Sequence, residues 1–140
     1  MQIHASCGAR DGAGVLLLGP PGAGKSDLLL RLLDRGFELV ADDRVEVEGH
    51  EVFAPPALAG LLEVRGLGLL RLPHRTRARL VLAVELGARS ERLPEPARHP
   101  RFDIPQVALD PFTISAAQRV ALALDCAEGR LAQQAGAFAP

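Results

Sequence analysis

The chain has 140 residues, 48% of them hydrophobic, and its 16 basic and 17 acidic residues leave a net charge of −1. A chain of this size can bury about two-thirds of its unfolded surface, so we expect one domain spanning residues 1–140. Nucleic-acid-binding proteins normally carry a basic excess, which this composition lacks. No signal-peptide or membrane-span pattern is present, so we expect a cytoplasmic protein with neither nucleic acid nor membrane among its partners.

Two cysteines are too far apart to suggest a metal or redox motif. Cys7 and Cys126 match no known ligand spacing. We therefore expect two free thiols, buried or partly buried, in a reducing compartment.

The first predicted elements enclose a glycine-rich stretch. The apolar run 15–18 is typical of a strand buried on both faces. From Ser26 onward leucines recur at helical spacing, and Gly36 suits the left-handed residue that ends many helices. Residues 37–41 predict a second strand, which ends at a pair of aspartates.

Further strands are predicted in the middle of the chain. Residues 45–48 alternate between apolar and acidic, and a Gly-His turn can connect them to 51–53 as a hairpin. A segment rich in Gly and Leu follows at 59–72. The apolar run 80–86 predicts another strand.

The last part of the chain contains a long loop and a helix. Residues 87–111 are rich in Pro, Arg and Glu and predict a long loop, a feature that is often functional. Ser115 is expected to be the N-cap of a final helix that runs through Cys126. We expect residues 136–140 to fray.

A complete P-loop lies between the first strand and the first helix, formed by Gly19, Pro20, Pro21, Gly22, Ala23, Gly24, Lys25 and Ser26. Glycines let successive backbone N–H groups face a polyphosphate, and the following helix presents its positive end. Lys25 can reach the β- and γ-phosphates, and the Ser26 hydroxyl can coordinate Mg²⁺. The pattern predicts a nucleotide site.

An acidic residue is needed beside the P-loop to hold the metal or to act as a base. Asp42 and Asp43 end the second strand, and Glu85 lies in a later one. Adjacent carboxylates repel each other unless a cation or proton lies between them, which favours one as a base while both stay near Mg²⁺. The alternatives are a solvated turn for the aspartates and an exposed strand position for Glu85.

Two further groups carry weaker signals. Glu63 and Arg65 are two residues apart and would face the same side of an extended segment, and the glycines at 66 and 68 permit close approach of a backbone or phosphate. A surface ion pair on a turn is the alternative. His4 alone is more often structural or solvent-facing.

Together these motifs resemble the catalytic domain of the HPr kinase/phosphorylase family. The resemblance rests on His4, the P-loop, the stretch 39–45 and the stretch 62–68, in that order, and extends through residue 68. It weakens after residue 80, although residues 91–93 resemble the short segment that holds the family's catalytic arginine.

The resemblance implies an α/β fold, that of a P-loop kinase of the phosphoenolpyruvate-carboxykinase-like type, with a mixed central sheet and flanking helices. It implies that ATP and Mg²⁺ are used to phosphorylate a serine of HPr, the small phosphocarrier of the sugar phosphotransferase system, or of a paralogue. The family's reverse reaction uses inorganic phosphate to remove that group and releases pyrophosphate.

The resemblance also implies roles for the matched side chains. Asp43 would take the serine proton, and Asp42 would help to hold the metal and its waters. Ser26 and Glu63 would be Mg²⁺ ligands.

The remaining implied roles concern charge and orientation. Lys25 would clamp the phosphates, Arg92 would stabilise charge on the transferring group, and His4 would orient the aspartates or the incoming phosphate. Such roles agree with the view that phosphoryl transfer depends on positioning and electrostatics.

Two departures from the family pattern bear on function. His4 is nearly the first residue, so the family's long amino-terminal domain and any regulation through it are expected to be absent. The family's Pro-Val-Arg-Pro-Gly-Arg loop, associated with the reverse reaction, is replaced at 108–113 by a segment without arginine. The sequence therefore does not decide whether the chain catalyses phosphorolysis or whether it forms a homo-oligomer like the family's hexamer.

Two alternatives compete with a protein kinase. One is a small-molecule P-loop kinase with Glu85 as its second metal residue. The other is a nucleotide-binding regulator or sensor with little turnover. The sequence identifies neither the HPr paralogue nor an effector metabolite.

Overall fold

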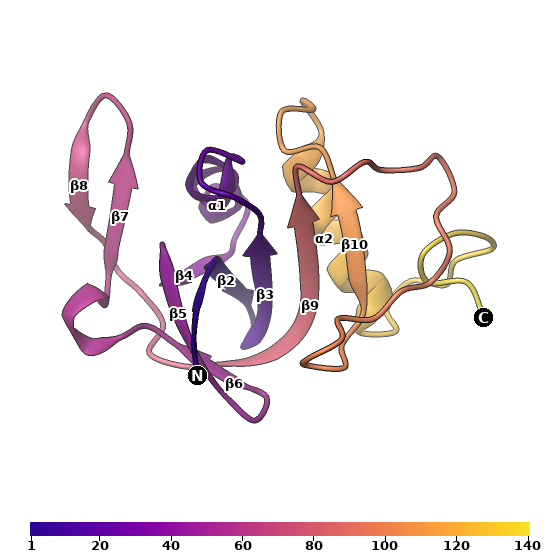
Figure 1. The fold of residues 1–140 in the computed structure, drawn as a ribbon, viewed down its shortest axis with the longest axis horizontal. Coiled ribbons are helices and arrows are strands. Elements are labelled where there is room, and N and C mark those ends of the chain that lie inside the picture. Colours follow the sequence, from indigo (N-terminus) through magenta and orange to yellow (C-terminus); the bar gives the residue numbers. More distant parts are fainter.

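The computed structural model describes all 140 residues, and its main feature is an eight-stranded sheet (Figure 1). In spatial order its strands are β1 (Gln2–His4), β5 (Arg44–Glu48), β6 (Glu51–Phe53), β9 (Ala78–Leu86), β3 (Ala13–Leu18), β2 (Ser6–Arg10) and β4 (Glu38–Ala41), with β10 (Gln106–Leu109) paired to β9. Strands β3, β9 and β10 are parallel to one another, and the remaining pairs are antiparallel. The predicted mixed sheet is confirmed.

Both α-helices pack on one face of this sheet. Apolar residues of α1 (Lys25–Leu33) and α2 (Ala116–Ala127) form a single core cluster with Leu17 and Leu82. The neighbouring residues Leu16 and Ala83 face the other side, where they pack with Phe102 and Ile104. The predicted helices therefore flank one face only, and neither is long and apolar enough to cross a membrane.

Most elements expected from the pattern are present. The apolar runs form β3, β4 and β9, and the expected hairpin forms β5 and β6 around Gly49. Gly36 has a φ of +87°, as expected for the residue that ends a helix. Ser115 is the N-cap residue of α2, but its hydroxyl accepts a hydrogen bond from Arg119 instead of capping the backbone.

The long loop predicted at 87–111 is wrong for its last part. Residues Gln106–Leu109 form β10, which lies parallel to the end of β9 and buries Val107 in the core. The fraying expected at 136–140 stays a prediction. Phe138 packs against the core, and its N–H donates to the Gln133 side-chain oxygen at 2.7 Å.

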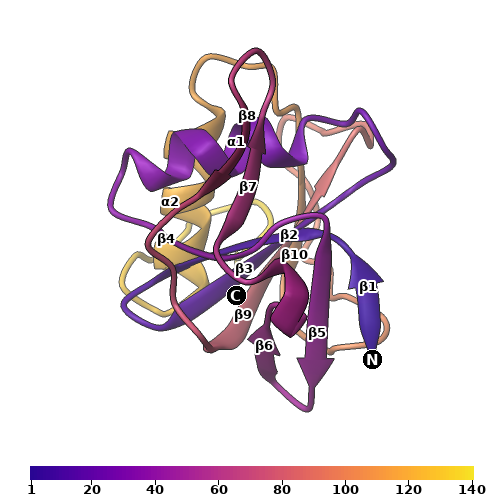
Figure 2. The ribbon, with the colours of Figure 1, turned by 90° about the vertical axis from the view of Figure 1, so that its left-hand side faces the viewer.

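A separate hairpin lies outside the main sheet. Strands β7 (Leu61–Val64) and β8 (Gly68–Arg71) pair antiparallel, after a 3₁₀ helix at Pro56–Leu58. Figure 2 shows this hairpin in front of α1, and Leu62 is buried against the leucines of that helix. Arg65 lies in the turn, so the expectation that it shares an extended segment with Glu63 is wrong.

The strand directions bring distant loops to one edge of the sheet. Leu18 pairs with Glu85, and Glu85 pairs with Ala108, so the segments after β3, β9 and β10 begin at the same edge. Strand β4 is antiparallel to β2, which is antiparallel to β3, so β4 also ends there. This edge carries both the P-loop and the aspartate pair.

Candidate active site

The P-loop makes a tight turn between β3 and α1. Gly19 has a φ of +152°, and a Cβ atom there would lie 2.7 Å from the Leu86 carbonyl oxygen, so no larger residue fits without displacing backbone. Gly24 has a φ of +97° and is the N-cap residue of α1. The positive end of the helix therefore begins directly at the loop, as an anion site requires.

The ammonium group of Lys25 lies over this loop. It donates hydrogen bonds to the carbonyl oxygens of Gly19 at 2.7 Å and Pro20 at 3.0 Å. Pro20, Pro21 and Gly22 are exposed, so the loop lies at the surface of the molecule. A phosphate placed there would meet a charge-assisted donor and backbone N–H groups.

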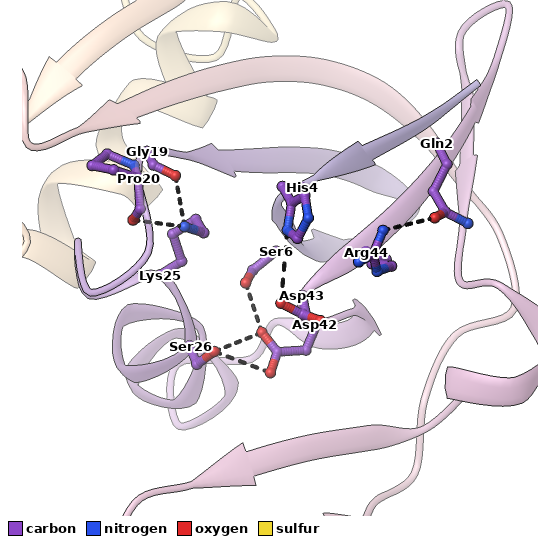
Figure 3. Close-up of polar contacts among 10 residues, drawn as sticks. All are labelled: Gln2, His4, Ser6, Gly19, Pro20, Lys25, Ser26, Asp42, Asp43 and Arg44. Carbon is purple, nitrogen blue, oxygen red and sulfur yellow. Dashed lines mark hydrogen bonds and ion pairs between the residues drawn. The ribbon is translucent and has the colours of Figure 1, made fainter.

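Asp42 connects the P-loop to the sheet (Figure 3). The Ser26 hydroxyl donates one hydrogen bond that the two oxygens of the Asp42 carboxylate share, at 2.8 and 3.0 Å, and Ser6 Oγ donates a second at 2.6 Å. Asp42 is buried, with 7% of its surface exposed, and Ser6 is fully buried. Because a buried carboxylate needs hydrogen-bond donors to remain stable, the two serines fix its position.

Asp43 lies beside this group but faces solvent. Its φ of +69° is a left-handed conformation that Asp tolerates better than most residues, and its side chain is 71% exposed. The Asp43 carboxylate lies 3.9 Å from His4 Nδ1, an ion pair when the histidine is protonated. The backbone N–H of Ala5 donates to the Asp43 carbonyl, which keeps the end of β1 against this turn.

The structure does not bring Glu63 or Arg92 to this group. No hydrogen bond or ion pair joins either residue to the P-loop or to the aspartates, and both side chains are exposed. Glu63 alternates with the buried Leu62 on β7, and the segment that carries Arg92 extends away from α1 in Figure 1. Their metal and charge-stabilising roles stay predictions.

No group of three or more His, Cys, Asp or Glu side chains could hold a metal ion by itself. The available donors near the P-loop are the oxygens of Ser26 and Asp42. Hydroxyl and carboxylate oxygens suit Mg²⁺, which in nucleotide sites takes one or two protein ligands together with phosphates and waters. The side chains therefore fit a metal that arrives with a nucleotide.

Glu85 lies at the same edge of the sheet but does not contact Ser26. It is half-buried at the end of β9 and faces the side covered by residues 97–105. Burial lowers the pKa of His99, Arg101 adds to this effect, and the negative charge of Glu85 opposes it. The acid that contacts the P-loop serine is thus Asp42 and not Glu85.

Both cysteines are free thiols, as expected. Cys7 follows Ser6 on β2 and is fully buried. Burial raises its pKa from 9.0 to about 12, so the group remains a neutral thiol beside the site.

Ser6 was not identified from the sequence. The only indication in the sequence is that Ser6 carries the single hydroxyl group within residues 5–9, which are otherwise small and apolar. Its importance follows from the position of β2 between β3 and β4, which places Ser6 next to the end of β4. That pairing is not visible in local sequence.

A family model described as the HPr Serine kinase C-terminal domain matches residues 1–85, which include the P-loop, Ser6 and both aspartates. The chain belongs to this family. The match ends at residue 85, near the end of β9, where that strand reaches the edge of the sheet that carries the P-loop. The later residues, with β10 and α2, lie outside it.

Curated relatives support the same assignment, which is one of an enzyme family. The chain is 47% identical over 90 residues to the HPr kinase/phosphorylase of Bordetella petrii, covering 54% of this chain and 28% of the relative. It is 44% identical over 102 residues to that of Cupriavidus metallidurans, covering 59% and 31%. The aligned part is thus less than a third of the length of these relatives.

A solved structure shows the same fold over nearly the whole chain. The Hpr(Ser) kinase/phosphatase from Coxiella burnetii has a TM-score of 0.69 and 20% identity, covering 93% of this chain and 96% of that one. This coverage extends beyond residues 1–85, so the shared fold includes most of the chain outside the family match.

Proposed function

We propose that this chain transfers the γ-phosphoryl group of ATP to a serine of an HPr-type phosphocarrier protein. The observation that carries the proposal is the Asp42 carboxylate hydrogen-bonded to the P-loop serine, with Asp43 exposed beside it. Names of relatives describe the substrate only for those proteins, and the motif and fold shared with them support extending it to this chain.

The site residues divide between the nucleotide and the acceptor. Lys25 and the P-loop N–H groups would bind the β- and γ-phosphates. Mg²⁺, held by Ser26 and supported by Asp42, would neutralise phosphate charge. Because Ser26 donates its proton to Asp42, the lone pairs of its oxygen remain available.

In this proposal Asp43 would act as the base. It would take the proton of the incoming serine as that oxygen forms a bond to the γ-phosphorus and the bond to the β-phosphate oxygen breaks, which releases ADP. Its exposure leaves room for a side chain from another protein. His4, 3.9 Å away, would orient the carboxylate.

The experiment is a transfer assay with ATP, Mg²⁺ and an HPr-type protein, followed by identification of phosphoserine. We expect labelling by the wild-type chain and a loss of about 10²–10⁴-fold in rate for Asp43→Asn, with ATP binding retained. Asp11→Asn is the matched control, because Asp11 is also exposed and left-handed (φ +51°) but lies in the turn between β2 and β3, away from the P-loop.

Other outcomes would identify the competing functions. ATP binding without transfer would favour a nucleotide sensor. Activity that survives Asp43→Asn but disappears in Glu85→Gln would favour a small-molecule kinase. The reverse reaction is tested by adding inorganic phosphate to the phosphorylated protein and measuring pyrophosphate.

A further inference from the structure

One aromatic side chain stands exposed beside the P-loop. The chain has five phenylalanines and neither Trp nor Tyr. Phe37 and Phe102 are buried, Phe53 and Phe138 are partly buried, and Phe112 alone is exposed, at 73%. An isolated exposed aromatic ring in a chain with so few aromatics needs a reason.

Phe112 lies next to the last glycine of the P-loop. A Cβ atom built on Gly24 would lie 3.4 Å from Cζ of Phe112 and 3.3 Å from Cγ of Pro111. The ring edge therefore touches the N-cap of α1, where the phosphates would bind. A Cβ atom at position 24 would thus lie in contact with both Pro111 and the ring.

The turn that carries Phe112 is held in place from both sides. Arg31 of α1 donates a hydrogen bond to the Pro111 carbonyl oxygen, and Pro111 is buried. The Phe112 N–H donates to the Asp110 carboxylate at 2.9 Å, and the N–H of Thr113 donates to the Asp110 carbonyl at 3.3 Å. The ring is thus presented by a fixed backbone.

Sheet order shows which part of a nucleotide would meet this ring. Asp42 and Asp43 follow β4, on the β2 side of the P-loop strand, and mark where the γ-phosphate and the acceptor would lie. Phe112 follows β10, on the β9 side of the same strand. With the γ-phosphate directed toward the aspartates, the nucleoside extends toward β10.

We propose that the Phe112 ring forms a stacking platform for the base of the bound ATP, an inference that rests on the proposed function. Every purine base presents a flat π-face, and an aromatic side chain stacks on it whatever the base edge carries. The phosphates would provide most of the affinity at the P-loop, and Phe112 would add selectivity for a nucleotide over inorganic polyphosphate.

The first test compares ATP with inorganic tripolyphosphate, each with Mg²⁺, by titration calorimetry. We expect Phe112→Ala to weaken ATP binding about tenfold, the size of one base–aromatic stack, and to leave tripolyphosphate binding unchanged. Ile114→Ala is the matched control, since Ile114 is 96% exposed on the same turn and the three atoms nearest to a Cβ built on Gly24 belong to Pro111 and Phe112. An equal loss for both ligands, or no loss, would overturn the proposal.

A second variant reports on the ring directly. Phe112→Trp would place the only tryptophan of the chain at this position. We expect ATP to quench its fluorescence, with tripolyphosphate having little effect. Equal quenching by both would indicate a change in the loop and would count against stacking.

Two results distinguish a failure of the stacking proposal from a failure of the proposed kinase function. If Phe112→Ala raises the KM for the HPr-type protein without changing ATP affinity, the ring contacts the protein substrate and the stacking proposal is wrong, while the kinase proposal stands. If the wild-type chain binds neither ATP nor tripolyphosphate, the proposed function fails, and the stacking proposal fails with it.

Discussion

The Asp42 carboxylate depends on a serine from a different strand. Ser6 Oγ donates to it at 2.6 Å in a fully buried position, and a hydrogen bond to a charged group contributes about 1.5–3 kcal/mol. We therefore expect Ser6→Ala to lower the free energy of unfolding by about 1.5–3 kcal/mol in urea titrations. It should also raise the Mg²⁺ concentration needed for half-maximal transfer, because Asp42 is then less well positioned.

Ser90→Ala is the control for this prediction. Ser90 is exposed in the segment after β9, so its removal should change the free energy of unfolding by no more than about 0.5 kcal/mol. Equal effects of the two variants would show that the Ser6–Asp42 hydrogen bond contributes nothing measurable.

Because the Cys7 thiol is buried, the free energy of unfolding is expected to decrease at alkaline pH. Burial raises its pKa to about 12 in the folded chain, so between about 9 and about 12 the unfolded chain binds fewer protons than the folded one. The contribution of this thiol to the free energy of unfolding is therefore fully present below pH 9. Above pH 9 the free energy of unfolding decreases, and this group accounts for at most about 1.4 kcal/mol per pH unit. Urea titrations at several pH values measure the slope, and Cys7→Ala should reduce it. An unchanged slope would assign the effect to other groups.

The P-loop combines glycines with different constraints. A Cβ at Gly19 would meet the Leu86 carbonyl at 2.7 Å, whereas a Cβ at Gly22 has nothing within 4 Å. We expect Gly22→Ala to cost only about 1–2 kcal/mol from its left-handed backbone, with ATP binding largely kept. Gly19→Ala should displace the loop and abolish ATP binding by calorimetry. Similar ATP affinities for the two variants would contradict this view of the loop.

Local sequence was sufficient for the elements that are long or strongly patterned. The run before the P-loop, the leucines of α1 and the Asp42–Asp43 pair are contiguous signals, and each appears where expected. Strand β10 was missed because it has only four residues within a stretch rich in proline. Strands β1 and β2 were missed because residues 2–10 show no apolar run, and the β7–β8 hairpin because its glycines interrupt the strand pattern.

The candidate site was predictable only in part. His4, Lys25, Ser26 and the aspartates come together because their strands end at one edge of the sheet. The partnership of Ser6 with Asp42 depends on which strands are neighbours, which spacing along the chain does not encode. Exposure of Phe112 beside Gly24 likewise depends on the packing of α1 against the end of β10.

At the scale of the whole molecule, one arginine joins the beginning of the chain to its end. Arg10 Nη2 on β2 donates to Asp125 at 2.6 Å and to Glu128 at 3.3 Å, at the end of α2 and its C-cap, with only 19% of the Arg10 side chain exposed. We expect Arg10→Met to lower the free energy of unfolding by about 1–2 kcal/mol, measured in urea.

The control is Arg77→Met. Arg10 lies over the Phe37 ring, and Arg77 likewise lies over the Phe53 ring and pairs with one acid, Glu51, but its side chain is 53% exposed. An exposed pair contributes less than about 1 kcal/mol, so this variant should change stability little. If both variants lower the free energy of unfolding by the same amount, burial of the ion pairs of Arg10 is not what stabilises the contact between β2 and α2.

The parallel pairing of β3 with β9 has a consequence for how the chain acquires its structure. Leu16 of β3 pairs with Ala83 of β9. Strand β3, which precedes the P-loop, therefore cannot pair with β9 until the ribosome has synthesised the chain through Leu86. Pairings between such distant segments are slow, since a long loop must close before any contact forms. We infer that on the nascent chain β3 can pair early with β2, while its other edge stays unpaired until β9 has been synthesised.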